Sequence, residues 1–375
     1  MKFVDEFRQS ETMKKLAQEI RQLADPSRTY RIMEICGGHT HAIFRFGLSQ
    51  LLPKNIELIH GPGCPVCVLP MGRMDIGLGM AEREDLIFTA FGDMMRVPGS
   101  TGSPLESKAR GADIRMVYSP LDALKIAQQN PDKPVMFFAI GFETTAPSTA
   151  VTLMRAREAG VENFFVYCNH ILVNPAIRAL LETEGMQLDA FIGPGHVSTV
   201  IGCETYNFIA DEFKRPLVVS GFEPADILQS IVMILRQMNA DEARIENQYK
   251  RAVPYEGNPA ARAALDLVFE TRDTFEWRGM GDIPHSAYAI REEFAAFDAE
   301  KQIGVHGQTF PDPVDAQCGE VLTGTLKPCD CRLFGKGCTP EKPVGALMVS
   351  SEGACAAQYK YADLSFGATD NQGWP

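Results

Sequence analysis

The chain has 375 residues, 45% of them hydrophobic and 22% charged, and a formal net charge of −12. This length predicts two or three domains of ordinary globular composition. So acidic a chain, with no run of Lys or Arg longer than two residues, disfavours a nucleic-acid partner. No apolar stretch reaches the length of a membrane span, and the N-terminal segment lacks the apolar core of a signal peptide. We therefore expect a cytoplasmic protein without a membrane partner, and reduced thiols.

Short apolar runs alternate with amphipathic segments over the first two-thirds of the chain. Residues 1–24 mix acids and bases at helical spacing, so we expect a helix there that packs with the last domain. Strands are predicted at Tyr30–Ile35, Ile56–Ile59, Leu86–Ala90, Ile114–Val117, Val135–Ala139, Phe164–Tyr167, Ala190–Ile192 and Leu217–Val219. Helices are predicted at Leu121–Gln129, Ser148–Ala159, Pro175–Thr183 and Pro224–Met238. The alternation indicates parallel α/β layers.

A weak internal repeat divides this part of the chain. Cys36 follows one predicted strand, and a Gly-Pro-Gly sequence begins 25 residues later at Gly61; Cys168 and Gly193 repeat this spacing. With strands and loops also in phase, we interpret the pattern as a duplication. It predicts two similar α/β units, residues 25–130 and 131–240.

The remaining residues, 241–375, predict a third module. They are helical at first, with a helix expected at Glu292–Lys301, and then rich in Gly and Pro, with five cysteines between 318 and 355. Because the apolar runs here are short, we expect this module to be built around a metal.

Glycine-rich loops follow the predicted strands at residues 36–41, 61–67, 141–145, 193–198 and 221–224. In open α/β sheets, ligands bind at loops beyond the carboxyl ends of the strands. Cysteine or histidine occurs in three of these loops. We therefore expect the loops to share one cleft.

The C-terminal cysteines are the strongest sign of a metal site. Four thiolates suit either a tetrahedral zinc ion or a [4Fe–4S] cluster. The uneven spacing matches neither a zinc ribbon nor a ferredoxin, and it leaves open whether Cys329 or Cys331 is the spare residue. The five candidates are Cys318, Cys329, Cys331, Cys338 and Cys355.

Two further groups of residues predict chemistry in the first unit. Cys64-Pro-Val-Cys67 can form a reversible disulfide. Cys36, with His39 and His41 close by, predicts a thiolate of lowered pKa near a helix N-terminus, suited to a transient iron site. Cys168 and Cys203 each stand alone and are interpreted as core residues.

Several common catalytic motifs are missing from the sequence. It contains no GxxxxGK[ST] for ATP, no GxGxxG, no HExxH and no CxxxCxxC. An oxidoreductase with bound nicotinamide is therefore disfavoured.

Long segments of the sequence resemble the HypD family of hydrogenase maturation factors. The resemblance extends from residue 31 to about 361, and it rests on CGGHTHAIFRFG, HGPGCPVCVLPMGRMD, GFETTAP, GPGHVS, GFEP, ENQYKRAV, FEWRGMGDIP and LFGKGCTPEKPVGALMVSSEGACAA. It implies two Rossmann-like parallel-sheet domains and a third domain that binds a [4Fe–4S] cluster. It also implies that the protein assembles the Fe(CN)2CO group of [NiFe]-hydrogenase.

The resemblance also implies partners and site residues. Iron would bind Cys36 together with a cysteine of a small HypC-type chaperone, and cyanide would come from HypE. Glu352 matches a functional position of the family, and Cys329 is extra. In the ALMVS segment, Leu347 stands where the family often has a cysteine. The cluster ligands would be Cys318, Cys331, Cys338 and Cys355.

The residues and the resemblance combine in one hypothesis, which has two rivals. Cys36, Cys64 and Cys67 would lie close together, and the Cys64/Cys67 pair would pass electrons from the cluster. One rival is a stand-alone thiol–disulfide oxidoreductase with a structural zinc. The other is a structural interaction module, in which Cys64 and Cys67 would be buried and resist alkylation.

Overall fold

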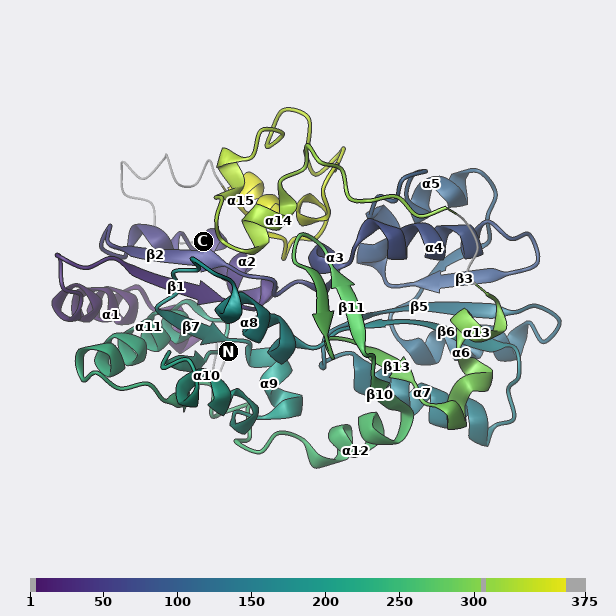
Figure 1. Ribbon diagram of the computed structural model, residues 1–375, viewed down its shortest axis with the longest axis horizontal. Coiled ribbons are helices and arrows are strands. Elements are labelled where there is room, and N and C mark those ends of the chain that lie inside the picture. Colours follow the sequence, from purple (N-terminus) through teal and green to yellow (C-terminus); the bar gives the residue numbers. More distant parts are fainter. Residues whose placement is uncertain (1–4, 305–307, 362–375) are drawn as a thin grey trace.

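Two parallel β-sheets form the frame of the molecule, a computed structural model that describes residues 5–304 and 308–361 (Figure 1). The five-stranded sheet has the order β2 (Ile56–His60), β1 (Tyr30–Glu34), β7 (Ala190–Gly193), β8 (Leu217–Val219) and β9 (Ile245–Asn247). The four-stranded sheet has the order β4 (Ile114–Met116), β3 (Ile87–Ala90), β5 (Val135–Gly141) and β6 (Phe164–His170). Every strand pairing in both sheets is parallel. The expected α/β class with two Rossmann-like sheets is confirmed.

All the predicted strands exist, but they are shared between the sheets differently from the prediction. β1 and β2 pair with each other, and β1 also pairs with β7, whereas β3 and β4 join β5 and β6. Each sheet therefore takes strands from both predicted units, 25–130 and 131–240. The chain leaves the first sheet after β2, builds the whole second sheet, and then returns.

The proposed repeat fails for the same reason. β1 and β2, which precede Cys36 and Gly61, are neighbours in one sheet, whereas β6 and β7 of the supposed second copy lie in different sheets. The equal spacing of 25 residues has a simpler explanation, because it is about the length of one strand–helix–strand unit. Such units recur in α/β folds without duplication of the sequence.

The N-terminal helix α1 (Ser10–Leu23) packs against α11 (Pro224–Asn239), so the expected packing with the last domain is wrong. Its buried residues Met13, Ala17 and Ile20 recur at helical spacing and meet the apolar face of α11. The side-chain amide of Asn239 also donates a hydrogen bond to the carbonyl oxygen of Leu23, at 2.9 Å. This pair of helices covers one face of the five-stranded sheet.

The four predicted helices correspond to α6, α7, α8 and α11, and no end differs from the prediction by more than two residues. Prolines and caps set several starts; for example, Ser119 caps α6 by accepting a hydrogen bond from the backbone of Leu121 at 3.1 Å. Besides α1 and α11, the α-helices of the described chain up to residue 268 are α2 (Gly37–Arg45), α3 (Pro65–Val68), α4 (Met71–Ala81), α5 (Pro104–Ala109), α6 (Pro120–Gln129), α7 (Ala146–Glu158), α8 (Val173–Glu182), α9 (Gly195–Ile201), α10 (Asn207–Asp211) and α12 (Pro259–Val268).

The chain beyond α12 contains strands that the sequence did not predict. β10 (Phe269–Thr271) pairs with β13 (Tyr288–Ile290), and β11 (Thr274–Trp277) forms a hairpin with β12 (Gly281–Pro284). The helix expected at 292–301 is divided into a 3-10 turn and α13 (Ala299–Gln302). Unlike β7 and β8, which are short but continuously apolar, most of these strands mix apolar with polar, Gly or Pro residues, so the sequence pattern does not mark them.

The last described segment has little regular structure beyond α14 (Cys318–Leu322) and α15 (Ala354–Tyr361). Figure 1 shows both helices above the five-stranded sheet, close to α2 and α3. Their buried residues belong to the same hydrophobic core as those of α3 and α4. In the part of the chain that the structure describes, no helix has the length and apolarity needed to cross a bilayer.

Candidate functional site

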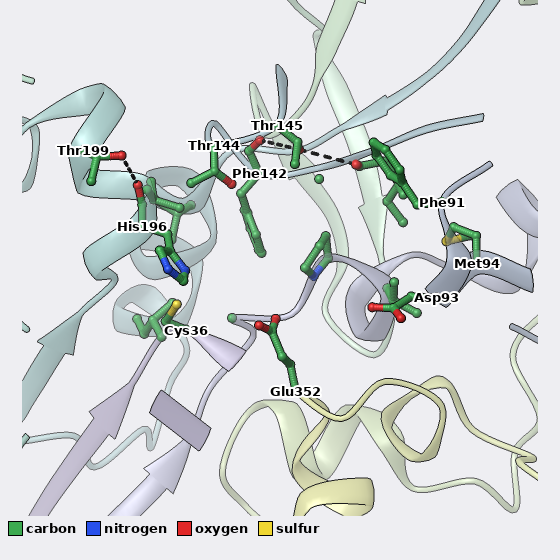
Figure 2. Close-up of a pocket in the computed structure, with 18 residues that line it drawn as sticks. Cys36, Phe91, Asp93, Met94, Phe142, Thr144, Thr145, His196, Thr199 and Glu352 are labelled. Carbon is green, nitrogen blue, oxygen red and sulfur yellow. Dashed lines mark hydrogen bonds between the residues drawn. The ribbon is translucent and has the colours of Figure 1, made fainter. Parts of the chain in front are cut away.

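A cavity of about 360 Å³ lies where the strand ends of the two sheets face each other (Figure 2). Four of the five predicted loops line it, as expected for loops beyond the carboxyl ends of parallel strands. The fifth loop, 221–224, lies behind the wall, where Phe222 stacks on His196 with ring centroids 4.0 Å apart. The polar and sulfur-bearing side chains of the lining are Cys36, Asp93, Met94, Thr144, Thr145, His196, Thr199 and Glu352.

Cys36 occupies the N-cap position of α2, directly after β1, and its side chain lies in the cavity wall. Its backbone N–H donates to the buried Glu34 carboxylate at 3.0 Å. The predicted lowering of its pKa is wrong. Burial, with the nearby negative charge of Glu352, raises the pKa of the Cys36 thiol to about 12. The free protein therefore holds a neutral thiol at this position.

Glu352 reaches the same cavity from the far end of the chain. Figure 2 shows Glu352 and Cys36 both directed into the space between the loops. A Cβ added at Gly37 would lie 2.5 Å from the Cβ of Glu352, so only glycine lets the two segments pack this closely. Burial raises the pKa of Glu352, and the negative charge of Asp93 adds to the increase.

His39 and His41, the two histidines predicted to assist Cys36, do not line the cavity. His39 is fully buried; its Nε2 donates to the carbonyl oxygens of Ser220 and Gly221 at 3.2 and 3.1 Å. Its Nδ1 has no hydrogen-bond partner among the described residues. His41 instead contacts the carbonyl oxygen of Ser351 through Nδ1, at 3.1 Å.

His196 is the histidine that the structure places at the cavity. It follows β7 at the start of α9, and Figure 2 shows its imidazole directed toward Cys36. Sequence reasoning identified the loop 193–198 but not this residue. The signal was available, because His196 stands in a glycine-rich loop after a strand, as Cys36 does.

Cys64 and Cys67 are joined as a disulfide at the start of α3, with their Cα atoms 5.3 Å apart. Both are buried. Pro65 and Val66, between them, line the cavity, while α3 also packs against residues 346–348 of the C-terminal segment. Helix α3, here called the dithiol helix because Cys64 and Cys67 become a dithiol when their disulfide is reduced, therefore lies between the cavity and the cysteine-containing segment.

Four C-terminal cysteines line a second, apolar hollow, here called the cysteine pocket. Cys329 is not among them; it is exposed, with its Sγ 3.8 Å from a carboxylate oxygen of Asp330. The backbone N–H of Val344 donates to the Sγ of Cys338 at 3.3 Å. The cysteine pocket is lined by Cys318, Cys331, Cys338 and Cys355 together with Ala316, Gln317, Val321, Leu333, Phe334, Gly345, Leu347 and Met348.

This donor set fits a [4Fe–4S] cluster, which takes one thiolate on each iron. Burial raises the pKa of Cys318 to about 11 and holds the pKa of Cys355 well above its usual value, and the neighbouring cysteines add to the increase in both cases. Cations that replace the thiol protons would remove this penalty. Over residues 5–304 and 308–361, no three Cys, His, Asp or Glu side chains are arranged to hold a single metal ion.

Cys168 and Cys203 are buried core residues, as predicted. They are 1% and 0% exposed. The Sγ of Cys168 donates to the carbonyl oxygen of Tyr288 at 3.4 Å.

Comparison with known proteins gives one consistent result. The HypD family model, described as "Hydrogenase formation hypA family", matches residues 11–362. The hydrogenase maturation factor HypD of Escherichia coli is 54% identical over 366 residues, covering 96% of this chain and 98% of that protein. Those of Rhodobacter capsulatus and Rhizobium leguminosarum are 55% and 52% identical, each covering 96% of this chain, with 98% and 96% of their own lengths aligned. The chain thus belongs to the HypD family of hydrogenase maturation factors.

Proposed function

We propose that the protein is the scaffold on which the Fe(CN)2CO group of a [NiFe]-hydrogenase is assembled. Iron, the cargo, binds Cys36 together with a cysteine of a small HypC-type chaperone, and HypE delivers cyanide. The observation that supports this most strongly is the cavity itself. It brings Cys36 and Glu352 together, 316 positions apart in the sequence (352 − 36), next to the dithiol helix α3.

Cys36 must lose its proton to bind iron, because the thiolate is the ligand. Its raised pKa means that a cation and a base have to act together. Glu352 lies in the same cavity and is a carboxylate of raised pKa, suited to accept that proton. The apolar part of the lining, including Phe91 and Phe142, would limit the contact of bound iron with water.

The cysteine pocket is proposed to hold a [4Fe–4S] cluster through Cys318, Cys331, Cys338 and Cys355. A bound cluster would supply electrons one at a time. Cys64 and Cys67 form a dithiol–disulfide pair at the start of α3, which packs against residues 346–348 of the segment that lines this pocket. Their place between the two sites supports a role in passing electrons from the pocket to the cavity.

Anaerobic purification of the chain with its small chaperone tests the iron site. We expect Cys36→Ala to reduce the CN and CO infrared bands to less than about a tenth while the absorbance of the cluster stays intact. Cys203→Ala, which alters a buried cysteine outside the cavity, should retain both signals. Infrared bands of full strength in Cys36→Ala would refute the assigned role.

The same preparation separates the scaffold from its rival. Iron and sulfide near four per chain are expected for the scaffold, and one zinc for a stand-alone oxidoreductase. Cys338→Ala should lose the brown colour, whereas Cys329→Ala, whose thiol is exposed outside the pocket, should keep it.

A further inference from the structure

The turn of the β11–β12 hairpin inserts between α3 and α14. Figure 1 shows the hairpin rising between these two helices. A Cβ added at Gly279 would lie 2.1 Å from the Cα of Gly319, so the backbone of the turn touches the first turn of α14. Trp277, just before the turn, is almost fully buried, and its indole N–H donates to the hydroxyl of Ser286 at 2.9 Å. The hairpin is thus held rigidly against the residue next to Cys318.

Arg278, the first residue of this turn, holds the C-terminal end of α3. Its Nε and Nη2 donate to the carbonyl oxygen of Leu69 at 3.1 and 2.8 Å, and its backbone N–H donates to the carbonyl oxygen of Val68 at 2.8 Å. Its Nη1 pairs with Asp312. A helix leaves its last carbonyl groups without partners, and a buried guanidinium satisfies them here. Arg278 therefore fixes the helix that carries Cys67.

The same guanidinium lies beside the cysteine pocket. Arg278 and Cys318 line one adjoining hollow of about 250 Å³, together with Asp312. Although burial raises the pKa of Cys318, the charge of Arg278 opposes the increase. Arg278 is only 4% exposed, so solvent screens its charge little. One side chain thus contacts the dithiol helix and acts on a cysteine of the pocket.

We propose that Arg278 is a positioning residue that ties the Cys64/Cys67 helix to the cysteine pocket and places a buried positive charge beside Cys318. The inference rests on the proposed function, in which the pocket holds a cluster and the dithiol receives its electrons. Rigid attachment of α3 favours the closed disulfide. The positive charge favours the more reduced, more negative state of a group bound by the four thiolates.

Two variants separate the two roles. Arg278→Gln removes the charge, and Arg278→Lys keeps the charge but loses the planar fork that binds Leu69. We expect both variants to shift the Cys64/Cys67 equilibrium toward the dithiol at least tenfold, about 30 mV for this two-electron couple. Peptide-resolved alkylation of the full chain in dithiothreitol redox buffers measures this shift.

The charge is tested by redox titration of the cluster followed by electron paramagnetic resonance. We expect Arg278→Gln to lower the midpoint potential and Arg278→Lys to leave it close to that of the wild type. Asp312→Asn removes the counter-charge and should raise the potential. Opposite signs from the two partners of one ion pair are not expected from loosened structure alone.

Arg272→Gln is the matched control, because Arg272 also bonds backbone carbonyls and a carboxylate, but around Cys168. The proposal is overturned if Arg278→Gln shifts the dithiol equilibrium and the potential no more than this control. If circular dichroism shows that Arg278→Gln is unfolded, Arg278→Lys tests the shift of the Cys64/Cys67 dithiol–disulfide equilibrium. Asp312→Asn then tests the shift of the cluster's midpoint potential. A wild-type chain that carries no cluster would refute the proposed function. The redox titration of Cys64 and Cys67 would still test whether Arg278 holds α3 in place.

Discussion

Cys36 is the N-cap residue of α2, where a helix N-terminus would favour the thiolate, yet its pKa is raised to about 12 because the thiol is buried near Glu352. The sequence could predict Cys36 as a site residue, since it ends a strand within a glycine-rich loop. It could not predict the protonation state, because that depends first on how deeply the folded chain buries the thiol and then on a carboxylate more than 300 positions away. His39 and His196 show the same limit: both were visible as loop histidines, but only the packed chain shows which one reaches the cavity.

Glu143, next to the cavity wall, leads to a prediction about pH. Its Oε1 accepts a hydrogen bond from the backbone of Val173 at 3.1 Å, and its Oε2 is buried without a hydrogen-bond partner in the described chain. Burial raises its pKa from 4.5 to about 7. Between these values the folded state keeps a proton that the unfolded state has lost, so this group makes the protein less stable as pH rises toward 7. The loss amounts to about 3 kcal/mol.

The measurement is the unfolding free energy of wild type and Glu143→Gln at pH 5 and pH 8. Glutamine cannot ionise, so the variant should gain stability relative to the wild type at pH 8 and show little such gain at pH 5. Other titrating groups, such as His170, cancel in this comparison because both proteins contain them. An equal difference at the two pH values would show that Glu143 does not ionise in this range.

At the level of elements, local pattern predicted where the strands and four of the helices lie, but not how the strands join. Apolar runs such as 135–141 mark a strand because both faces are buried. Nothing in such a run specifies its neighbour in the sheet, and the expected consecutive units therefore failed. The hairpin that carries Arg278 was missed because its two short strands, unlike apolar runs such as Leu217–Val219, contain polar residues, a glycine and a proline.

Gly63 joins two elements of the site, and its substitution tests their packing. A Cβ at this position would lie 2.2 Å from the backbone nitrogen of Cys36, and backbone atoms cannot move aside as a side chain can. We expect Gly63→Ala to cost about 3 kcal/mol and to lower the unfolding temperature by about 5 °C or more. The reason is that α3 and the start of α2 are forced apart.

Gly72→Ala, in the first turn of α4, is the control for Gly63→Ala. Its added Cβ would meet only the Thr309 side chain, at an ordinary contact distance of 3.5 Å. We expect no loss of stability, and a gain of about 0.5 kcal/mol from the reduced freedom of the unfolded chain. Equal unfolding temperatures for the two variants would contradict the tight packing at Gly63.

At the scale of the whole molecule, residues 345–355 connect the cavity with the cysteine pocket. Glu352 lines the first, and Leu347, Met348 and Cys355 line the second. The two sites are thus only a few residues apart along one segment, and α3 packs on that segment. The sequence showed the cysteines and the glutamate in one motif, but only the fold shows that they face different hollows.

Gly353 lies at the bend of this segment, where an added Cβ would come within 2.3 Å of the carbonyl oxygen of Leu347. Gly353→Ala must therefore displace Glu352 on one side and Cys355 on the other. With a cluster in the cysteine pocket and iron at Cys36, as proposed above, we expect Gly353→Ala to reduce both the iron–sulfur content and the retention of iron by at least about half. Gly345→Ala is the control, because its added Cβ would crowd only the Sγ of Cys318, at 2.3 Å. This variant should lower the iron–sulfur content more than it lowers the retention of iron at Cys36. Iron and sulfide analysis beside infrared spectra of both variants measures the difference. If Gly353→Ala disturbed one site and spared the other, the two would not depend on a common bend.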